Sequence, residues 1–306
     1  MSSPPRRTAP EPAAGRRYLL SPQFLRKLEQ AAIASRHVLA GRTKGERRSA
    51  RRGTSVEFAD FRAYTPGDDL RYLDWNAFAR LQRLFLKLFM EEEDLHVYLL
   101  LDASRSMAFG SPTKFSWAVQ AAAALGYMAL CGGDRVQVFA HARGQGSSSR
   151  LFRGRGAAPE MFDWLSAAEP AGETDLASAT RWLQRTAPAP GLTFFLSDLL
   201  QPEWEPALAR LAVGKGEACV LQVLSREEHE PTLRGDLKLL DAESDDSREI
   251  TMGASVLRRY ERERDDFLEA VRKACFRYGF SHLFVVSDQP VEDVILRSLR
   301  RLEVVK

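Results

Sequence analysis

Short apolar runs alternate along most of this chain with longer segments of helical periodicity. A strand that is apolar at every position is buried on both faces, as happens in parallel sheets that carry helices on each side. The pattern predicts a doubly wound α/β domain with a mainly parallel sheet from about residue 94 to 306. Its expected strands are 97–101, 135–140, 192–196, 218–224 and 281–286. Its expected helices are 114–130, 159–168, 176–186, 203–213, 255–278 and 290–302, with a hairpin within 231–253.

The residues before this domain have a different character. Residues 1–17 are rich in proline, alanine and arginine, and we expect a disordered basic tail. Residues 18–93 are expected to form a helical and β appendage that packs against the domain. Within it, Ser21 and Pro22 open a helix predicted to run to about Leu39, and 84–89 alternates like a strand.

Composition argues against several classes of protein. No apolar run approaches the ~20 residues that a membrane-spanning helix needs, and the N-terminus has no apolar segment typical of a secretory signal. Three cysteines, Cys131, Cys219 and Cys275, lie far apart without a CxxC pair. This spacing indicates reduced core thiols rather than disulfides or a zinc site. We therefore expect a cytoplasmic protein.

The charge is unevenly distributed. Residues 1–52 contain 13 Lys and Arg against 3 Asp and Glu, a net charge of +10, so the remainder carries −7 of the total of +3. A basic segment of this kind is a candidate scaffold for nucleic acid or anionic lipid. The other interpretation is a solvated tail that contacts an acidic face. No aromatic stacking platform accompanies the arginines, so we expect no nucleic-acid partner.

Oxygen donors follow the predicted strands at their carboxyl ends. Asp102, Ser104 and Ser106 follow the first strand, Asp198 follows the strand at 192–196, and Thr174 precedes a helix. Ligands of open parallel sheets bind at this edge, and hard cations collect oxygen ligands. The five residues therefore predict a site for Mg²⁺ or Mn²⁺ that keeps an open position for a carboxylate of a partner. Glu173 and Asp175 flank Thr174 and are candidates to tune the metal.

Two alternatives stand beside this prediction. In the first, the serines cap the following helix and the aspartates serve turns, without a metal. In the second, the chain is a Mg²⁺-dependent phosphohydrolase of the haloacid-dehalogenase type, with Asp102 as nucleophile and Lys114 beside Asp198. Those enzymes usually place an acidic residue two positions after the nucleophile, where this chain has Ser104. No positioned base or nucleotide-binding loop is visible either, so we expect a protein that is not an enzyme.

Two resemblances extend this picture. The set Asp102-x-Ser104-x-Ser106, Thr174 and Asp198 resembles the metal-ion-dependent adhesion site of von Willebrand factor A domains. The segment from about residue 47 onward resembles the bacterial family called domain of unknown function 58. That second resemblance rests on Glu57, Phe58, Arg62, Tyr64, Gly67, Asp68, Arg71, Asp74, Trp75 and Arg80.

The resemblances imply a fold and partners. Members of the second family carry a von Willebrand factor A-like domain and are typically associated with MoxR-type AAA+ ATPases. This implies a metal-dependent interaction module that acts with such an ATPase in protein assembly or maturation. Many members also have two membrane-spanning helices near the N-terminus, and this sequence departs from them in having none.

The segment before the domain combines aromatic, acidic and arginine side chains. Aromatic residues mixed with arginine are typical of binding hot spots. The alternative is that Arg–carboxylate pairs hold the segment together and against the sheet. The candidate partner-binding residues are Arg62, Tyr64, Asp68, Arg71, Asp74 and Trp75.

Overall fold

The computed structural model describes residues 19–33, 57–66, 68–90, 95–143, 145–214, 216–232, 235–240, 243 and 247–305. Its centre is a sheet in which β3 (His96–Asp102) lies between β4 (Arg135–Ala142) and β7 (Leu192–Ser197). Beyond β7 follow β8 (Glu217–Leu224) and β11 (Ser281–Val286), and these five strands are parallel. The edge strands β5 (Gln145–Ser148) and β6 (Phe152–Arg153) pair antiparallel with β4.

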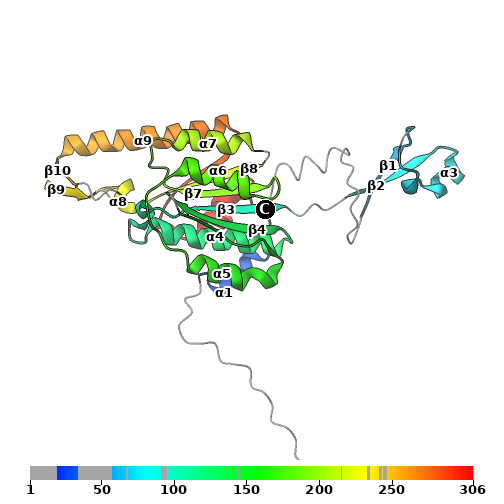
Figure 1. The fold of residues 1–306 in the computed structure, drawn as a ribbon, viewed down its shortest axis with the longest axis horizontal. Helices are drawn as coiled ribbons and strands as arrows, with labels where there is room; N and C mark the ends of the chain where they lie inside the picture. The colour runs from blue at the N-terminus through cyan, green and yellow to red at the C-terminus, as the bar shows by residue number, and fades with distance from the viewer. Residues whose placement is uncertain are drawn as a thin grey trace, which may run out of the picture.

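Helices cover both faces of this sheet (Figure 1). One face carries α4 (Lys114–Cys131) and α5 (Ala158–Ser166). The other face carries α6 (Leu176–Thr186), α7 (Trp204–Val213) and α9 (Ala254–Arg277). The alternating side chains of β3 divide between two apolar cores, with Leu99 and Leu101 in one and Leu100 in the other. The predicted mixed α/β fold with a mostly parallel sheet is therefore confirmed.

The helix α4 is the most deeply buried of the described helices. Its sequence is rich in alanine, and nearly all of its side chains are buried, so it lies inside the core rather than on its surface. Thr113 caps its start by accepting a hydrogen bond from the N–H of Ser116 at 3.1 Å. Gly126 allows α4 to pack closely on α5, because a Cβ there would lie 2.6 Å from Sδ of Met161 and would force that side chain to shift.

The N- and C-terminal helices of the described chain are shorter than predicted. The helix α1 (Pro22–Leu28) starts at the Ser21 cap as expected but ends at Leu28 instead of running to Leu39. The reason is tertiary pairing, since Ile33 leaves the helical path to form an antiparallel bridge with Val305. Residues 34–39 lie outside the described residues. The helix expected over 290–302 is divided into α10 (Val291–Asp293), the π-helical segment η4 (Val294–Ser298) and α11 (Leu299–Arg301), after which Val304 and Val305 turn into the core.

A second, smaller sheet belongs to the segment before the domain. Its strands β1 (Glu57–Ala63) and β2 (Phe85–Met90) pair antiparallel, which confirms the strand expected over 84–89. Between them lie the 3₁₀ turn η1 (Leu70–Tyr72) and α3 (Trp75–Leu81). Figure 1 shows this unit apart from the layered sheet, whereas α1 packs on α4. The tail 1–17 lies outside the described residues.

The remaining connections are short elements and one hairpin. The hairpin expected within 231–253 is present as β9 (Gly235–Leu240) and β10 (Ser247–Met252). Two short helical segments matter for the site, η2 (Arg105–Ala108) and α8 (Arg226–His229). Within the described ranges, no helix has the length and apolar character that crossing a bilayer requires.

Candidate functional site

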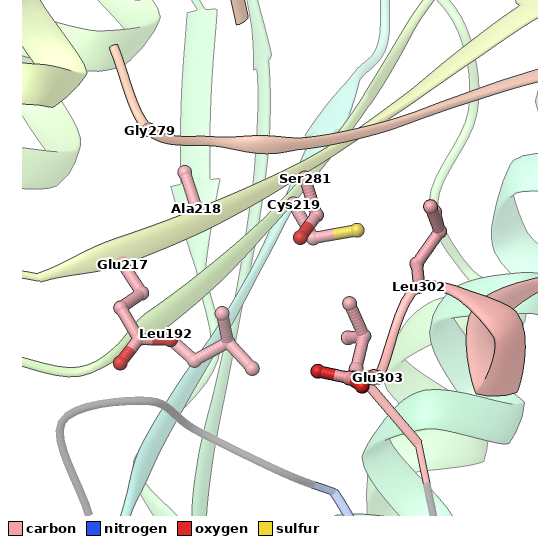
Figure 2. A pocket seen from close by; sticks show the side chains of 9 residues that line it. Leu192, Glu217, Ala218, Cys219, Gly279, Ser281, Leu302 and Glu303 are labelled. Atoms are coloured by element: carbon pink, nitrogen blue, oxygen red, sulfur yellow. The ribbon is translucent and has the colours of Figure 1, made fainter. Parts of the chain in front are cut away.

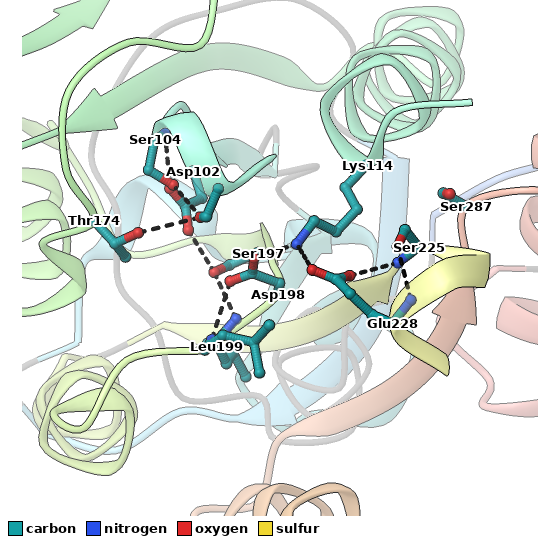
Figure 3. Close-up of polar contacts among 12 residues, drawn as sticks. Asp102, Ser104, Lys114, Thr174, Ser197, Asp198, Leu199, Ser225, Glu228 and Ser287 are labelled. Carbon is teal, nitrogen blue, oxygen red and sulfur yellow. Dashed lines mark hydrogen bonds and ion pairs between the residues drawn. The ribbon is translucent and has the colours of Figure 1, made fainter. Parts of the chain in front are cut away.

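The carboxyl ends of β3 and β7 lie side by side and bring two predicted donors together. Leu101 of β3 pairs with Leu196 of β7, so Asp102 and Ser197 come next to each other. Ser197 Oγ donates to Asp102 Oδ2 at 2.7 Å (Figure 3). Asp198 follows at once and lies close enough for its charge to act on Asp102. The pairing of these two strands therefore brings both aspartates to one edge of the sheet.

The three predicted hydroxyls form a row beside Asp102. Ser104 Oγ lies 2.9 Å from Ser106 Oγ, which lies 3.4 Å from Thr174 Oγ1. Backbone bonds hold the two loops in this position, since Arg105 N–H donates to the carbonyl of Gly172 and Ala171 N–H to that of Ala103. Residues 68 positions apart in sequence therefore meet at one strand end (Figure 3).

The spacing of these hydroxyls can be compared with that of oxygen ligands around a cation. Mg²⁺ binds oxygen at about 2.1 Å with octahedral geometry, which separates adjacent ligand oxygens by about 3.0 Å. The observed separations of 2.9 and 3.4 Å lie near that value. In the described part of the chain, no three His, Cys, Asp or Glu side chains cluster so as to hold a metal ion. A cation here would thus depend on hydroxyl ligands, and the donors present fit a hard cation.

Helix capping does not account for the serines. Ser104 stands at the N-cap of η2, yet its side chain makes no capping hydrogen bond, and α4 is capped by Thr113 instead. The alternative that the aspartates stabilise turns holds for one carboxylate oxygen of Asp102 and one of Asp198. Asp102 Oδ1 accepts from the N–H of Ser104 at 3.1 Å, and Asp198 Oδ1 accepts from that of Leu200 at 3.0 Å.

Burial and charge make the Asp102 carboxylate unusual. Asp102 is 3% exposed and Asp198 is fully buried. Burial, followed by the negative charge of Asp198, raises the pKa of Asp102 to about 6. An uncompensated carboxylate is costly in such a place, so a cation beside Asp102 would be stabilising.

The Asp198 carboxylate has a cation from the chain itself. Lys114 Nζ, at the start of α4, donates to Asp198 Oδ2 at 2.7 Å and to Glu228 Oε1 at 2.5 Å (Figure 3). The Lys114 side chain is fully buried. Burial disfavours its charge, but the charges of Asp198 and Glu228 outweigh this and raise the pKa of Lys114. Both carboxylate oxygens of Asp198 thus have donors already.

Sequence reasoning missed two acidic residues of this region. Glu228 belongs to a capping box with Ser225 that starts α8, and the Ser-x-x-Glu spacing was readable. Glu243, between β9 and β10, accepts from Thr174 through both oxygens, 2.6 Å from Oγ1 and 3.0 Å from the backbone N. The only sequence signal for Glu243 was the acidic run DAESDD at 241–246.

The two acids that flank Thr174 have other partners. Asp175 caps α6 by accepting from the N–H of Ser178 at 2.8 Å. Glu173 forms a surface ion pair with Arg143. Their expected role in tuning the metal therefore has no support in these contacts.

The candidate partner-binding residues hold the small unit together. Asp68 accepts from the side chain and the N–H of Thr65 and from Arg62 at 2.8 Å, which holds the pKa of Asp68 well below its usual range. Arg71 pairs with Asp69, and Asp74 caps α3. The expected Arg–carboxylate pairing is thus found for Arg71 with Asp69, whereas the partner of Asp68 is Arg62. The N–H of Tyr64 donates to the carbonyl of Leu84. Apolar side chains remain exposed on this unit, namely Phe61, Leu70, Trp75 and Leu81.

A pocket at the opposite end of the sheet is too small to be a ligand site. It lies among Leu192, Cys219, Ser281 and Leu302, at the amino ends of the strands (Figure 2). Its volume of about 20 Å³ has room for one water molecule. The strand end with Asp102 remains the stronger candidate.

Comparison with known proteins gives relatives without an assigned activity. Uncharacterized proteins of Mycobacterium bovis and Mycobacterium tuberculosis are each 30% identical over 256 residues, which covers 81% of this chain and 78% of the relative. A solved structure of BatB from Bacteroides thetaiotaomicron has 13% identity and a TM-score of 0.42, covering 68% of this chain and 98% of that one. An aerotolerance-related membrane protein from Bacteroides fragilis has 12% identity and a TM-score of 0.41, with 68% and 97% covered. TM-scores this low do not establish a shared fold.

A family model identifies the group. The model described as "Protein of unknown function DUF58" matches residues 60–299, which is most of the chain. The resemblance read from the segment around Arg62 and Trp75 is thereby confirmed. The protein belongs to the DUF58 family.

Proposed function

We propose that this protein is a non-enzymatic, divalent-metal-dependent interaction module built on a von Willebrand factor A-like domain. The observation that carries the proposal is the row of Ser104, Ser106 and Thr174 hydroxyls beside a buried Asp102. These groups come from two loops that meet at the carboxyl edge of a parallel sheet, where such folds bind ligands.

The metal ligands we assign are the three hydroxyls together with Asp102. Both Asp102 oxygens accept hydrogen bonds, and a carboxylate has lone pairs enough to bind a cation as well. Asp198 adds negative charge near the metal rather than serving as a main ligand, because one of its oxygens accepts a hydrogen bond from Lys114. A bound Mg²⁺ would supply a positive centre for a carboxylate of a partner protein. The chain's own residues fix the donors and exclude bulk water from Asp102.

The phosphohydrolase alternative has less support. Ser104 occupies the place where a general acid would stand, and its hydroxyl contacts Ser106. Lys114 is fully buried between two carboxylates, so it does not face a position that a phosphoester could reach. A basic-tail scaffold would depend on residues outside the described ranges.

The partners we propose follow from the family resemblance. We propose a MoxR-type AAA+ ATPase as the working partner in protein assembly or maturation, and an acidic segment as the ligand of the metal. The exposed side chains of Trp75 and Leu70 offer a second contact surface on the small unit.

Titration calorimetry with Mn²⁺ and Mg²⁺ tests the metal, and capture of a purified MoxR-type ATPase tests the partner. We expect saturable binding of metal by the wild type and loss of both activities in Asp102→Ala. The matched control is Asp266→Asn, an exposed acid on α9. The proposal fails if no metal binds and if Asp102→Ala captures the ATPase as well as the wild type does.

A further inference from the structure

The side chain of Glu243 lies at the candidate metal site although it comes from a distant hairpin. It is separated from Thr174 by 69 residues in sequence, yet both of its oxygens accept hydrogen bonds from that one residue. The hydroxyl of Thr174 is one of the ligands that we assign to the metal. A carboxylate of this chain therefore already contacts the donor set.

The position of this carboxylate continues the row of hydroxyls. The oxygens of Ser104, Ser106, Thr174 and Glu243 follow one another at 2.9, 3.4 and 2.6 Å. These separations are hydrogen-bond distances and also lie within about 0.4 Å of the ~3.0 Å between adjacent oxygen ligands of Mg²⁺. Ser104 and Thr174 are buried, whereas Ser106 and Glu243 are half-buried. Glu243 is thus partly accessible to solvent, as the place where a ligand from another protein enters must be.

We propose that Glu243 is an internal carboxylate ligand of this site, occupying the position that a partner's carboxylate would otherwise take. This inference rests on the proposed function, because it needs the metal site to exist. It adds a ligand from the β9–β10 hairpin to the four assigned ones, which are Asp102, Ser104, Ser106 and Thr174. In the absence of a partner, the carboxylate position of the site is then filled by Glu243 of the same chain.

An internal ligand sets a requirement on the partner. A tethered carboxylate has an effective concentration of about the millimolar range or above. A single free acidic side chain displaces Glu243 only if its own concentration, relative to its dissociation constant, exceeds the same ratio for the tethered Glu243. The partner is therefore an acidic protein segment that gains additional contacts elsewhere on this chain, and free acidic metabolites are excluded from the site.

Water-proton relaxation of the Mn²⁺-loaded full-length protein tests this assignment. Removing a direct ligand opens a place for water on the metal, so Glu243→Ala is expected to raise the relaxation enhancement and to lower Mn²⁺ affinity at least about tenfold. Acetate at tens of millimolar should reverse the gain in enhancement for Glu243→Ala and leave the wild type unchanged. Glu243→Gln keeps the shape of the side chain and is expected to lose affinity in the same direction.

The matched control is Glu249→Gln, an exposed acid on β10 of the same hairpin, which should behave as the wild type. If the wild type binds Mn²⁺ and both Glu243 variants match it in affinity and relaxation, Glu243 is not a ligand and the proposed metal site still stands. If the wild type binds neither Mn²⁺ nor Mg²⁺, the proposed function fails and this inference fails with it.

Discussion

The two halves of the candidate site solve the problem of buried negative charge in different ways. On one side, Asp198 and Glu228 surround the Lys114 ammonium, so the chain supplies its own cation. On the other side, Asp102 lies beside uncharged hydroxyls. Its pKa is raised because the carboxylate is buried and no positive group of the described chain neutralises its charge. The difference indicates that the first half serves the stability of the fold. The second half is the one suited to a cation from solution.

The largest effect is expected from removing the built-in cation. Lys114→Met should lower the free energy of unfolding by about 3–5 kcal/mol, because two carboxylates would be left without their buried partner. Urea denaturation of the metal-free protein measures it. Lys273→Met is the control, since Lys273 is exposed on α9 and its loss should change stability by less than about 0.5 kcal/mol. If Lys114→Met were as stable as the wild type, the cluster of Lys114, Asp198 and Glu228 would not serve the stability of the fold, and its contrast with the Asp102 half would not hold.

A change of opposite sign is expected at Asp102. The native pKa of about 6 exceeds the ordinary value of 3.8, so the native state binds this proton more tightly than the unfolded state does. Stability in EDTA should therefore fall as pH rises from about 4 to about 6, by up to roughly 3 kcal/mol. Asp102→Asn stays uncharged and should exceed the wild type in stability above pH 6, but not below pH 4.

The same pair of proteins gives a test with metal. Saturating Mg²⁺ should restore stability to the wild type at pH 8 and leave Asp102→Asn unchanged, which urea titrations with and without EDTA measure. Asp266→Asn should follow the wild type in both media. Equal pH profiles for wild type and Asp102→Asn would show that the Asp102 charge is compensated by the chain alone.

The smallest effect is expected at the edge of the hydroxyl half. Ser106 is half-buried, so Ser106→Ala should change the free energy of unfolding by less than about 1 kcal/mol. Its loss should weaken Mn²⁺ binding about tenfold in calorimetry, because a ligand is removed from the row. Ser148→Ala on β5, an exposed serine, is the control. Unchanged Mn²⁺ affinity in Ser106→Ala would mean that the hydroxyl row does not hold the metal.

The sheet was predictable because its signal is local. Strands such as β7 and β11 are apolar at consecutive positions, and their bounds agree with the sequence within a residue. Placing Asp102 beside Ser197 needed only the rule that neighbouring parallel strands end at one edge. Asp102, Ser104 and Asp198 could be chosen for the same reason.

The features that could not be predicted from the sequence depend on tertiary contacts. The phosphohydrolase alternative placed Lys114 beside Asp198, but nothing in the local sequence says that this lysine is fully buried and also binds Glu228. A lysine at a helix start is usually solvated. The hairpin was expected, but where Glu243 lies depends on how the separate β9–β10 hairpin is placed beside the main sheet. The early end of α1 at Leu28 likewise follows from the bridge between Ile33 and Val305, which are far apart in sequence.

The order of strands in the sheet has a consequence for synthesis on the ribosome. The sheet grows outward on one side in the order β3, β7, β8 and β11, which is also the order of translation. Synthesis proceeds at about 5–20 residues per second, and a domain generally folds as a unit. The donors from Asp102 to Asp198 therefore emerge several seconds before Glu243 is made. The acid that contacts Thr174 is the last of these groups to be made, so the strand end has its complete set of side chains only after the β9–β10 hairpin is synthesised.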